Sequence, residues 1–169
     1  MVNKSKTSAL RAASLLSVFS LALSAAMPSL ADNIQDFDAQ SFAHIKEQFA
    51  GQPFVVSLWS IDCVPCRVEL KMLGELKRQD PAFPLVVIST DPIENREEAA
   101  DILDSYQLKD VKSWMFADAF VERLRFSVDP QWHGELPRSY FYKADHQFES
   151  HSGVLTQTQL QQYFPQIAE

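Results

Sequence analysis

Apolar residues recur along the chain at two spacings, and each spacing predicts one kind of secondary structure. Phe42, Ile45 and Phe49 lie three or four residues apart, which is the repeat of an amphipathic helix, and a Gly-Gln-Pro sequence follows as a helix stop. Short unbroken apolar runs such as "PFVVSLW" at 53–59 are instead typical of buried strands. On these grounds we predict strands over 53–59, 84–90 and 113–116, and helices over 38–50, 65–79, 94–106, 118–126 (capped by Asp118) and 156–164.

The last third of the chain contains a loop and a hairpin. "VDPQWHGELP" at 128–137 holds two prolines and a glycine and predicts a loop. In "RSYFYKADHQFESHSG" at 138–153, Tyr140 and Tyr142 alternate with Phe141 and an Ala-Asp pair supplies a turn, so this segment predicts a β-hairpin. Strands alternating with helices, then a hairpin and a closing helix, predict an α/β fold: a mixed central sheet covered by helices on both faces.

The N-terminal segment has the composition of a secretory signal. Three basic residues within the first eleven positions precede an apolar stretch over 12–26, and small residues follow in Ser29-Leu30-Ala31. The apolar stretch has about fifteen residues, whereas a bilayer-spanning helix needs roughly 20. We therefore predict that residues 1–31 are a cleaved signal peptide and that residues 32–169 form one domain. An uncleaved membrane anchor is the alternative.

The charge of the chain limits the partners that it can bind. The whole sequence carries a net charge of −7, with 15 Lys and Arg against 22 Asp and Glu. The predicted signal peptide contains Lys4, Lys6 and Arg11 and no acidic residue, so its removal leaves 12 basic against 22 acidic residues and a net charge of −10. Nucleic acids and anionic membranes are bound by basic surfaces. We therefore expect no binding to nucleic acids or anionic membrane surfaces, and the short apolar stretch over 12–26 argues against a stable membrane anchor.

Cys63 and Cys66 are the two cysteines of the chain, and they are separated by two residues. An exported protein meets an oxidising compartment, but a bridge across so short a loop is a poor structural staple. Cys63 directly follows a predicted strand and precedes a helix, where free backbone N–H groups and the helix dipole favour a thiolate. Cys63 is therefore the candidate nucleophile and Cys66 the resolving cysteine, with Pro65 fixing the first helical turn.

The segment "SLWSIDCVPCRVEL" resembles the active site of the thioredoxin superfamily, and more narrowly of its exported TlpA/ResA-like branch. In that branch a tryptophan precedes Cys-x-Pro-Cys, and Arg-x-Glu follows it. The chain therefore resembles an enzyme with a thioredoxin fold. The matching residues are Trp59, Cys63, Pro65, Cys66, Arg67 and Glu69.

A second segment, "GELPRSYF", resembles the other signature of the superfamily. There a cis-proline before a strand packs against the active disulfide and helps to hold the backbone of the substrate. The resemblance gives this role to Pro137 and makes Leu136 the neighbouring residue that contacts substrate. The helix over 94–106 and the short strand after it resemble the βα insertion of the TlpA/ResA-like branch.

The chain departs from the family pattern at three places. Ser57 stands where thioredoxin has a buried acid that moves a proton to and from the second cysteine. Asp62 stands where the family has a second tryptophan, and a carboxylate beside Cys63 is expected to raise the pKa of that thiol and to favour the disulfide. Only about twenty residues separate the predicted signal peptide from the first predicted strand, which leaves little room for the extra N-terminal hairpin of this branch.

The resemblance implies a periplasmic thiol:disulfide oxidoreductase that reduces disulfides in exported clients, for example in cytochrome c maturation or metal-site assembly. It implies no metal and no cofactor beyond the redox-active disulfide. The implied partners are disulfide-bearing or dithiol proteins and a membrane electron donor of the DsbD/CcdA kind. The active-site support would come from Trp59, Asp62, Pro65, Leu136 and Pro137.

Other interpretations stay open from sequence. The pair could work in the opposite direction, as a disulfide oxidase or isomerase. It could bind copper as SCO-like chaperones do, although their two cysteines are separated by three residues. His133 could face the sulfur atoms. Arg67 and Glu69 either tune the redox pair or belong to an ordinary solvated helix face.

Overall fold

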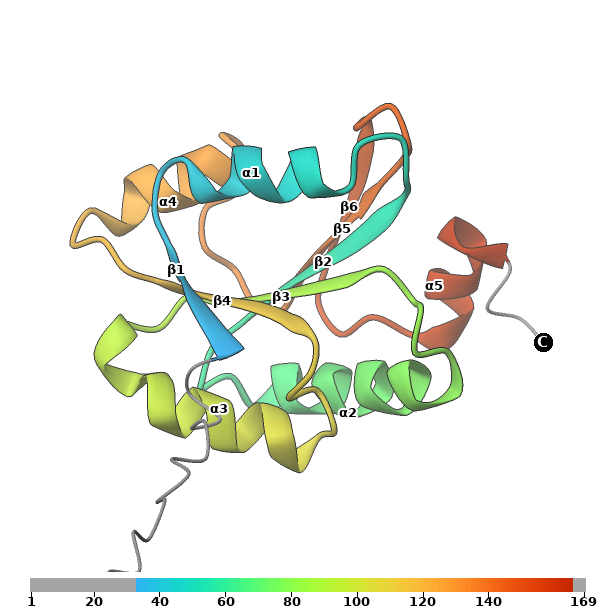
Figure 1. Ribbon diagram of the computed structural model, residues 1–169, viewed down its shortest axis with the longest axis horizontal. Coiled ribbons are helices and arrows are strands. Elements are labelled where there is room, and N and C mark those ends of the chain that lie inside the picture. The colour runs from blue at the N-terminus through green and yellow to red at the C-terminus, as the bar shows by residue number, and fades with distance from the viewer. Residues whose placement is uncertain (1–32, 166–169) are drawn as a thin grey trace, which may run out of the picture.

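A computed structural model describes residues 33–165, which form a single six-stranded sheet with helices on both faces (Figure 1). The strand order across the sheet is β1-β4-β3-β2-β5-β6. The strands are β1 (Ile34–Phe37), β2 (Phe54–Trp59), β3 (Leu85–Ser89), β4 (Lys112–Phe116), β5 (Arg138–Tyr142) and β6 (Phe148–Ser152). The helices are α1 (Ser41–Gln48), α2 (Val64–Gln79), α3 (Arg96–Ser105), α4 (Val121–Val128) and α5 (Gln157–Tyr163), with a 3₁₀ turn, η2 (Ile93–Asn95), before α3.

The sheet is mixed, as predicted. Strands β1, β4, β3 and β2 pair in parallel, whereas β5 pairs antiparallel with β2 and β6 pairs antiparallel with β5. Leu58, one residue from the end of β2, lies opposite Arg138, the first residue of β5. Cys63 follows the end of β2 and Pro137 precedes β5, so the topology brings both to the same edge of the sheet.

Residues of β1 to β5 supply two hydrophobic cores, one on each face of the sheet, because successive side chains of a strand point to opposite faces. On the face of α2, α3 and α5, Val55 and Phe141 pack with Leu70 and Leu103. On the face of α1 and α4, Val56 and Tyr140 pack with residues such as Phe42, Ile45 and Leu124. Figure 1 shows α1 and α4 on one side of the strands and α2 and α3 on the other. The prediction that helices cover both faces is confirmed.

Strand β1 was not predicted from the sequence. Ile34 pairs with Ser113 and Phe37 with Phe116, so β1 extends the sheet in parallel beyond β4. Its sequence, IQDF, is four residues long and has apolar residues only at its two ends. That pattern is too short to show a strand period, and its apolar residues become meaningful only once β4 lies beside them. Part of the segment before the first predicted strand is therefore sheet.

The prediction that Asp118 caps a helix is wrong. The Asp118 carboxylate accepts a hydrogen bond from the backbone N–H of Phe120 at 2.9 Å, and α4 begins only at Val121, without a side-chain cap. Asp118 instead forms a turn of the kind in which an aspartate binds the backbone two residues ahead. It also pairs with Arg123.

Gly74 marks the closest approach between α2 and the end of α3. A Cβ atom built on Gly74 would lie 1.9 Å from the backbone oxygen of Tyr106, which is far inside a van der Waals contact. We predict that Gly74→Ala lowers the free energy of unfolding by about 1–3 kcal/mol, because the added methyl group forces α2 away from the end of α3. Urea unfolding measures this, with the exposed neighbour Glu75→Ala as control. Equal midpoints for Gly74→Ala and the unsubstituted protein would contradict the packing described here.

The predicted signal peptide, residues 1–31, lies outside the described residues. Within residues 33–165, no helix is both long and apolar enough to cross a membrane.

Candidate active site

Cys63 and Cys66 form a disulfide at the junction of β2 and α2. Their Cα atoms are 5.2 Å apart. Cys63 is the N-cap of α2, and its Sγ accepts a hydrogen bond from the backbone N–H of Cys66 at 3.2 Å. Pro65 lies in the first turn, where a missing backbone N–H costs nothing. The predicted place of Cys63 at a helix N-terminus is confirmed.

The two cysteines differ in accessibility. Cys66 is fully buried and packs in the same core cluster as Trp59, whereas Cys63 is partly exposed at the border of that cluster. On the outer side of α2, Val64 is 76% exposed and Val68 is 59% exposed. An incoming molecule can therefore reach the sulfur of Cys63 over an apolar surface, but not that of Cys66.

Both backbone polar groups of Ile61, two residues before Cys63, are hydrogen-bonded to side chains. Its backbone N–H donates to the carboxylate of Asp91 at 2.8 Å, and its carbonyl accepts from the guanidinium of Arg67 at 2.8 Å. The Asp91 carboxylate also accepts from Ser89 Oγ at 2.6 Å. Arg67 is partly exposed and braces the cysteine loop through this bond. Asp91 was missed from sequence, because an Asp-Pro pair after a strand predicts only a turn.

Glu69 lies on α2, three residues after Cys66, and is buried, with 1% of its surface exposed. One carboxylate oxygen accepts from Ser57 Oγ at 2.8 Å and Ser139 Oγ at 2.9 Å, and the other accepts from the backbone N–H of Leu155 at 2.8 Å. The alternative of a solvated helix face is wrong for Glu69. Ser57 of β2 therefore donates to a carboxylate that α2 supplies.

Leu136 and Pro137 lie at the same edge of the sheet as the disulfide. The Leu136–Pro137 peptide bond is cis, as the resemblance implied, and the carbonyl of Pro137 accepts from the backbone N–H of Gly153 at 2.9 Å. Leu136 packs against the core cluster that contains Cys66, as do Ile61 and Cys63. Among residues 33–165, no hydrogen bond involves the backbone N–H or carbonyl of Leu136. Leu136 is partly exposed, and its two main-chain polar groups have no hydrogen-bond partner within this part of the chain.

The remaining predicted residues lie at the surface. Asp62 is exposed immediately before Cys63. His133 is exposed too; it lines a hollow with Phe126 of α4, and its backbone N–H donates to Glu135 at 3.3 Å. The described hydrogen bonds do not join His133 to either cysteine. Nowhere in residues 33–165 do three or more His, Cys, Asp or Glu residues gather as a metal site.

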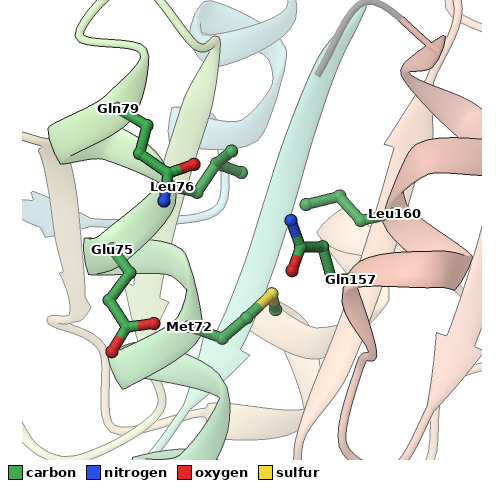
Figure 2. Close-up of a pocket in the computed structure, with 6 residues that line it drawn as sticks. All are labelled: Met72, Glu75, Leu76, Gln79, Gln157 and Leu160. Atoms are coloured by element: carbon green, nitrogen blue, oxygen red, sulfur yellow. The ribbon is translucent and has the colours of Figure 1, made fainter. Parts of the chain in front are cut away.

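A small pocket between α2 and α5 lies away from this edge of the sheet (Figure 2). Its volume is about 30 Å³, which is room for about one water molecule. Figure 2 shows side chains of the two helices facing each other across it. It is too small for a segment of another polypeptide. The lining residues are Met72, Glu75, Leu76, Gln79, Gln157 and Leu160.

Comparison with known proteins supports the fold. No protein-family model matches the chain, and no curated protein sequence does. Among solved structures, it is similar to a secreted Mycobacterium tuberculosis disulfide oxidoreductase homologous to E. coli DsbE, with 21% identity over 72% of this chain and 84% of that one and a TM-score of 0.56.

Two further solved structures agree with the first. A secreted thiol-disulfide isomerase from Corynebacterium glutamicum is 17% identical over 73% of this chain and 75% of its own, with a TM-score of 0.55. The thioredoxin domain of a Bacteroides vulgatus thiol-disulfide oxidoreductase is 18% identical over 73% and 84%, with a TM-score of 0.53. The chain has the thioredoxin fold, as predicted.

Proposed function

We propose that the protein is a thiol:disulfide oxidoreductase that reduces disulfides in exported client proteins. The observation that carries this proposal is the pairing of an accessible Cys63 at a helix N-terminus with a buried Cys66, beside a cis-proline segment with a free main chain. A structural disulfide would require neither the difference in exposure nor the open peptide groups of Leu136.

The reaction begins from the dithiol form. The Cys63 thiolate attacks one sulfur of a client disulfide, forms a mixed disulfide and releases the other client sulfur as a thiolate. The Cys66 thiolate then attacks Cys63, which restores the Cys63–Cys66 bond and releases the second client thiolate. Two electrons pass to the client. A dithiol donor must restore the reduced form, and the resemblance suggests a membrane protein of the DsbD/CcdA kind.

Glu69 is the group that we assign to proton transfer at Cys66. The two residues are three positions apart on α2, so their side chains lie on the same helix face, and both are buried. Cys66 must lose its proton before it can attack the mixed disulfide. A carboxylate one turn away can accept that proton, which is the role that Ser57 cannot fill.

Leu136 is the residue that we assign to client recognition. Its unpaired N–H and carbonyl can bond to the backbone of an extended client segment, which places the client disulfide near Cys63. Val64 and Val68 extend the apolar surface around this contact. Recognition through main-chain groups would allow several client sequences.

The reductive direction is favoured by the charges around the pair. Asp62 adjoins Cys63 and Glu69 lies one helical turn after Cys66, and negative charge disfavours a thiolate. A less stable dithiol form makes the disulfide relatively more stable and the protein a better reductant. Export into the periplasm is part of the proposal and is supported by the sequence of residues 1–31.

Asp62→Asn tests the effect of charge on Cys63. We expect the pKa of the Cys63 thiol to fall in the reduced protein, because a like charge beside the thiolate is removed. Alkylation of Cys63 by iodoacetamide at neutral pH should then be about threefold faster. Asp110→Asn, an exposed change before β4 at the opposite edge of the sheet, is the matched control. Equal alkylation rates in the two variants would show that the charge of Asp62 does not affect the Cys63 thiol.

The opposite direction, oxidation or isomerisation, is the second candidate, because one similar structure is a secreted thiol-disulfide isomerase. Two assays separate the directions. A reductase accelerates the reduction of insulin disulfides by dithiothreitol and oxidises reduced, unfolded clients slowly. An oxidase shows the reverse order of rates, and that result would overturn the proposed direction.

A further inference from the structure

The loop that carries Leu136 and Pro137 connects α4 to β5, and an ion pair joins its two ends. Asp129 directly follows α4, and Arg138 is the first residue of β5. The Arg138 guanidinium lies 3.4 Å from the Asp129 carboxylate, with side chains only 14% and 7% exposed. This nearly buried ion pair therefore joins the two ends of a ten-residue segment, 129–138.

Asp129 uses both carboxylate oxygens. Oδ1 accepts from the backbone N–H of Gln131 at 2.9 Å, which shapes the first turn of the loop. Oδ2, the oxygen that faces Arg138, also accepts from the Tyr140 hydroxyl at 3.1 Å. Burial raises the pKa of Tyr140, so that the hydroxyl remains a neutral donor. The start of the loop is therefore tied to β5 through two different side chains.

Arg138 also contacts residues other than Asp129. Its guanidinium donates to Ser152 Oγ at 2.5 Å and Ser150 Oγ at 2.8 Å on β6, and it lies over the ring of Tyr140 at 5.0 Å. It also donates to the carboxylate of Glu135 at 3.2 Å. The planar guanidinium of Arg138 therefore bonds to Asp129 and Glu135 of the loop and to two serines of β6. The single ammonium group of a lysine cannot make all of these bonds.

Glu135 directly precedes Leu136. Through Glu135, the hydrogen-bond network of Arg138 therefore extends to the residue next to the one that we assign to client recognition. Its carboxylate also accepts from Ser152 Oγ at 3.1 Å, and its carbonyl accepts from the indole N–H of Trp132 at 3.0 Å. Burial opposes ionisation of Glu135, but hydrogen bonds, including one from Ser152, together with the charge of Arg138 outweigh it, and its pKa lies below the ordinary value.

We propose that Arg138 is a positioning residue for client binding: through Asp129 and Glu135 it holds the open main chain of Leu136 in place beside the cysteine pair. This rests on the proposed function. Because the network does not bond to either cysteine, Arg138 should set the affinity for clients and leave the redox equilibrium of the pair unchanged. A buried ion pair adds little net stability compared with apolar packing, so its main effect is expected on the conformation of the loop.

The test compares KM with kcat for insulin disulfides, with dithiothreitol as electron source. Arg138→Met alone leaves Asp129 buried and uncompensated, so the double variant Arg138→Met/Asp129→Asn removes both charges and guards against misfolding. We expect both variants to raise KM about tenfold, with kcat and the thiol–disulfide equilibrium with glutathione within about twofold of the unsubstituted protein. Arg138→Lys should recover only part of the loss. Arg123→Met, at an exposed side chain of α4 that pairs with Asp118, is the matched control and should change neither constant.

Two results of these assays would overturn the inference. One is a folded double variant with unchanged KM; the other is a parallel change in KM and in the glutathione equilibrium, which would mean that Arg138 acts on the cysteines. If the unsubstituted protein fails to reduce insulin at all, the proposed function itself is wrong. Amide hydrogen exchange over 131–136 adds a readout that needs no turnover: it should become faster in the double variant, and unchanged exchange would also overturn the inference.

Discussion

Replacing Cys63 by serine should abolish the reduction of insulin disulfides, with a loss of more than about a thousandfold. The serine hydroxyl is not ionised at neutral pH and cannot form the mixed disulfide. Cys66 cannot take over the attack, because it is fully buried. The rate of insulin reduction with dithiothreitol measures this loss, after subtraction of the rate with dithiothreitol alone.

Cys66→Ser tests the second step of the reaction, in which the mixed disulfide is resolved. Cys63 remains able to attack, but the mixed disulfide is no longer resolved, so a covalent complex with the client should accumulate and disappear on treatment with excess reductant. Mass spectrometry of the trapped complex identifies both the client and the cysteine. The bridge closes a separation of only three residues, so all variants should remain folded. Activity retained in Cys63→Ser, or trapping through Cys66, would contradict the assigned roles.

Glu69→Gln should have the second-largest effect, on both stability and rate. The amide can turn so that its oxygen accepts from the backbone N–H of Leu155 and its nitrogen donates to the hydroxyl oxygens of Ser57 and Ser139, but three bonds to a charged carboxylate then become weaker bonds to a neutral amide in a buried place. We expect the free energy of unfolding to fall by about 1–3 kcal/mol. Loss of the proton acceptor should slow the resolution of the mixed disulfide by about a hundredfold.

Two measurements separate these effects. Urea unfolding gives the stability, and stopped-flow tryptophan fluorescence gives the two steps of disulfide exchange, since Trp59 packs in the core cluster of Cys66. Glu75→Gln, an exposed change on the same helix, is the matched control. If Glu69→Gln slowed the attack by Cys63 as much as the resolution by Cys66, the carboxylate would not act specifically on Cys66.

The elements that could be predicted from sequence are those whose signal is local. The apolar runs of β2 and β3 and the helical spacing of α2 reflect burial that each segment shows in its own sequence. The position of Cys63 follows in the same way, because a strand end, a proline and a helix start lie within a few residues. Strand β1 gave no such signal, since its two apolar residues pack only when β4 lies beside them.

The contacts that complete the site could not be predicted, because they join residues far apart in the chain. Glu69 is 70 positions from Ser139 and 86 from Leu155, and its burial follows from the packing of α2 against β5 and the segment before α5. The bond between Asp91 and Ile61 spans 30 positions. In each case a polar residue that is ordinary in sequence becomes a buried partner through the sheet order.

The reduction potential of the Cys63–Cys66 pair tests the central claim most directly. Equilibration against glutathione or dithiothreitol at neutral pH, followed by tryptophan fluorescence, gives the value. The account predicts a potential near or below about −250 mV, in the range of thioredoxin, which means a reductant that depends on a dedicated donor. A potential near about −120 mV, in the range of DsbA, would mean an oxidant and would contradict the proposed direction of electron flow.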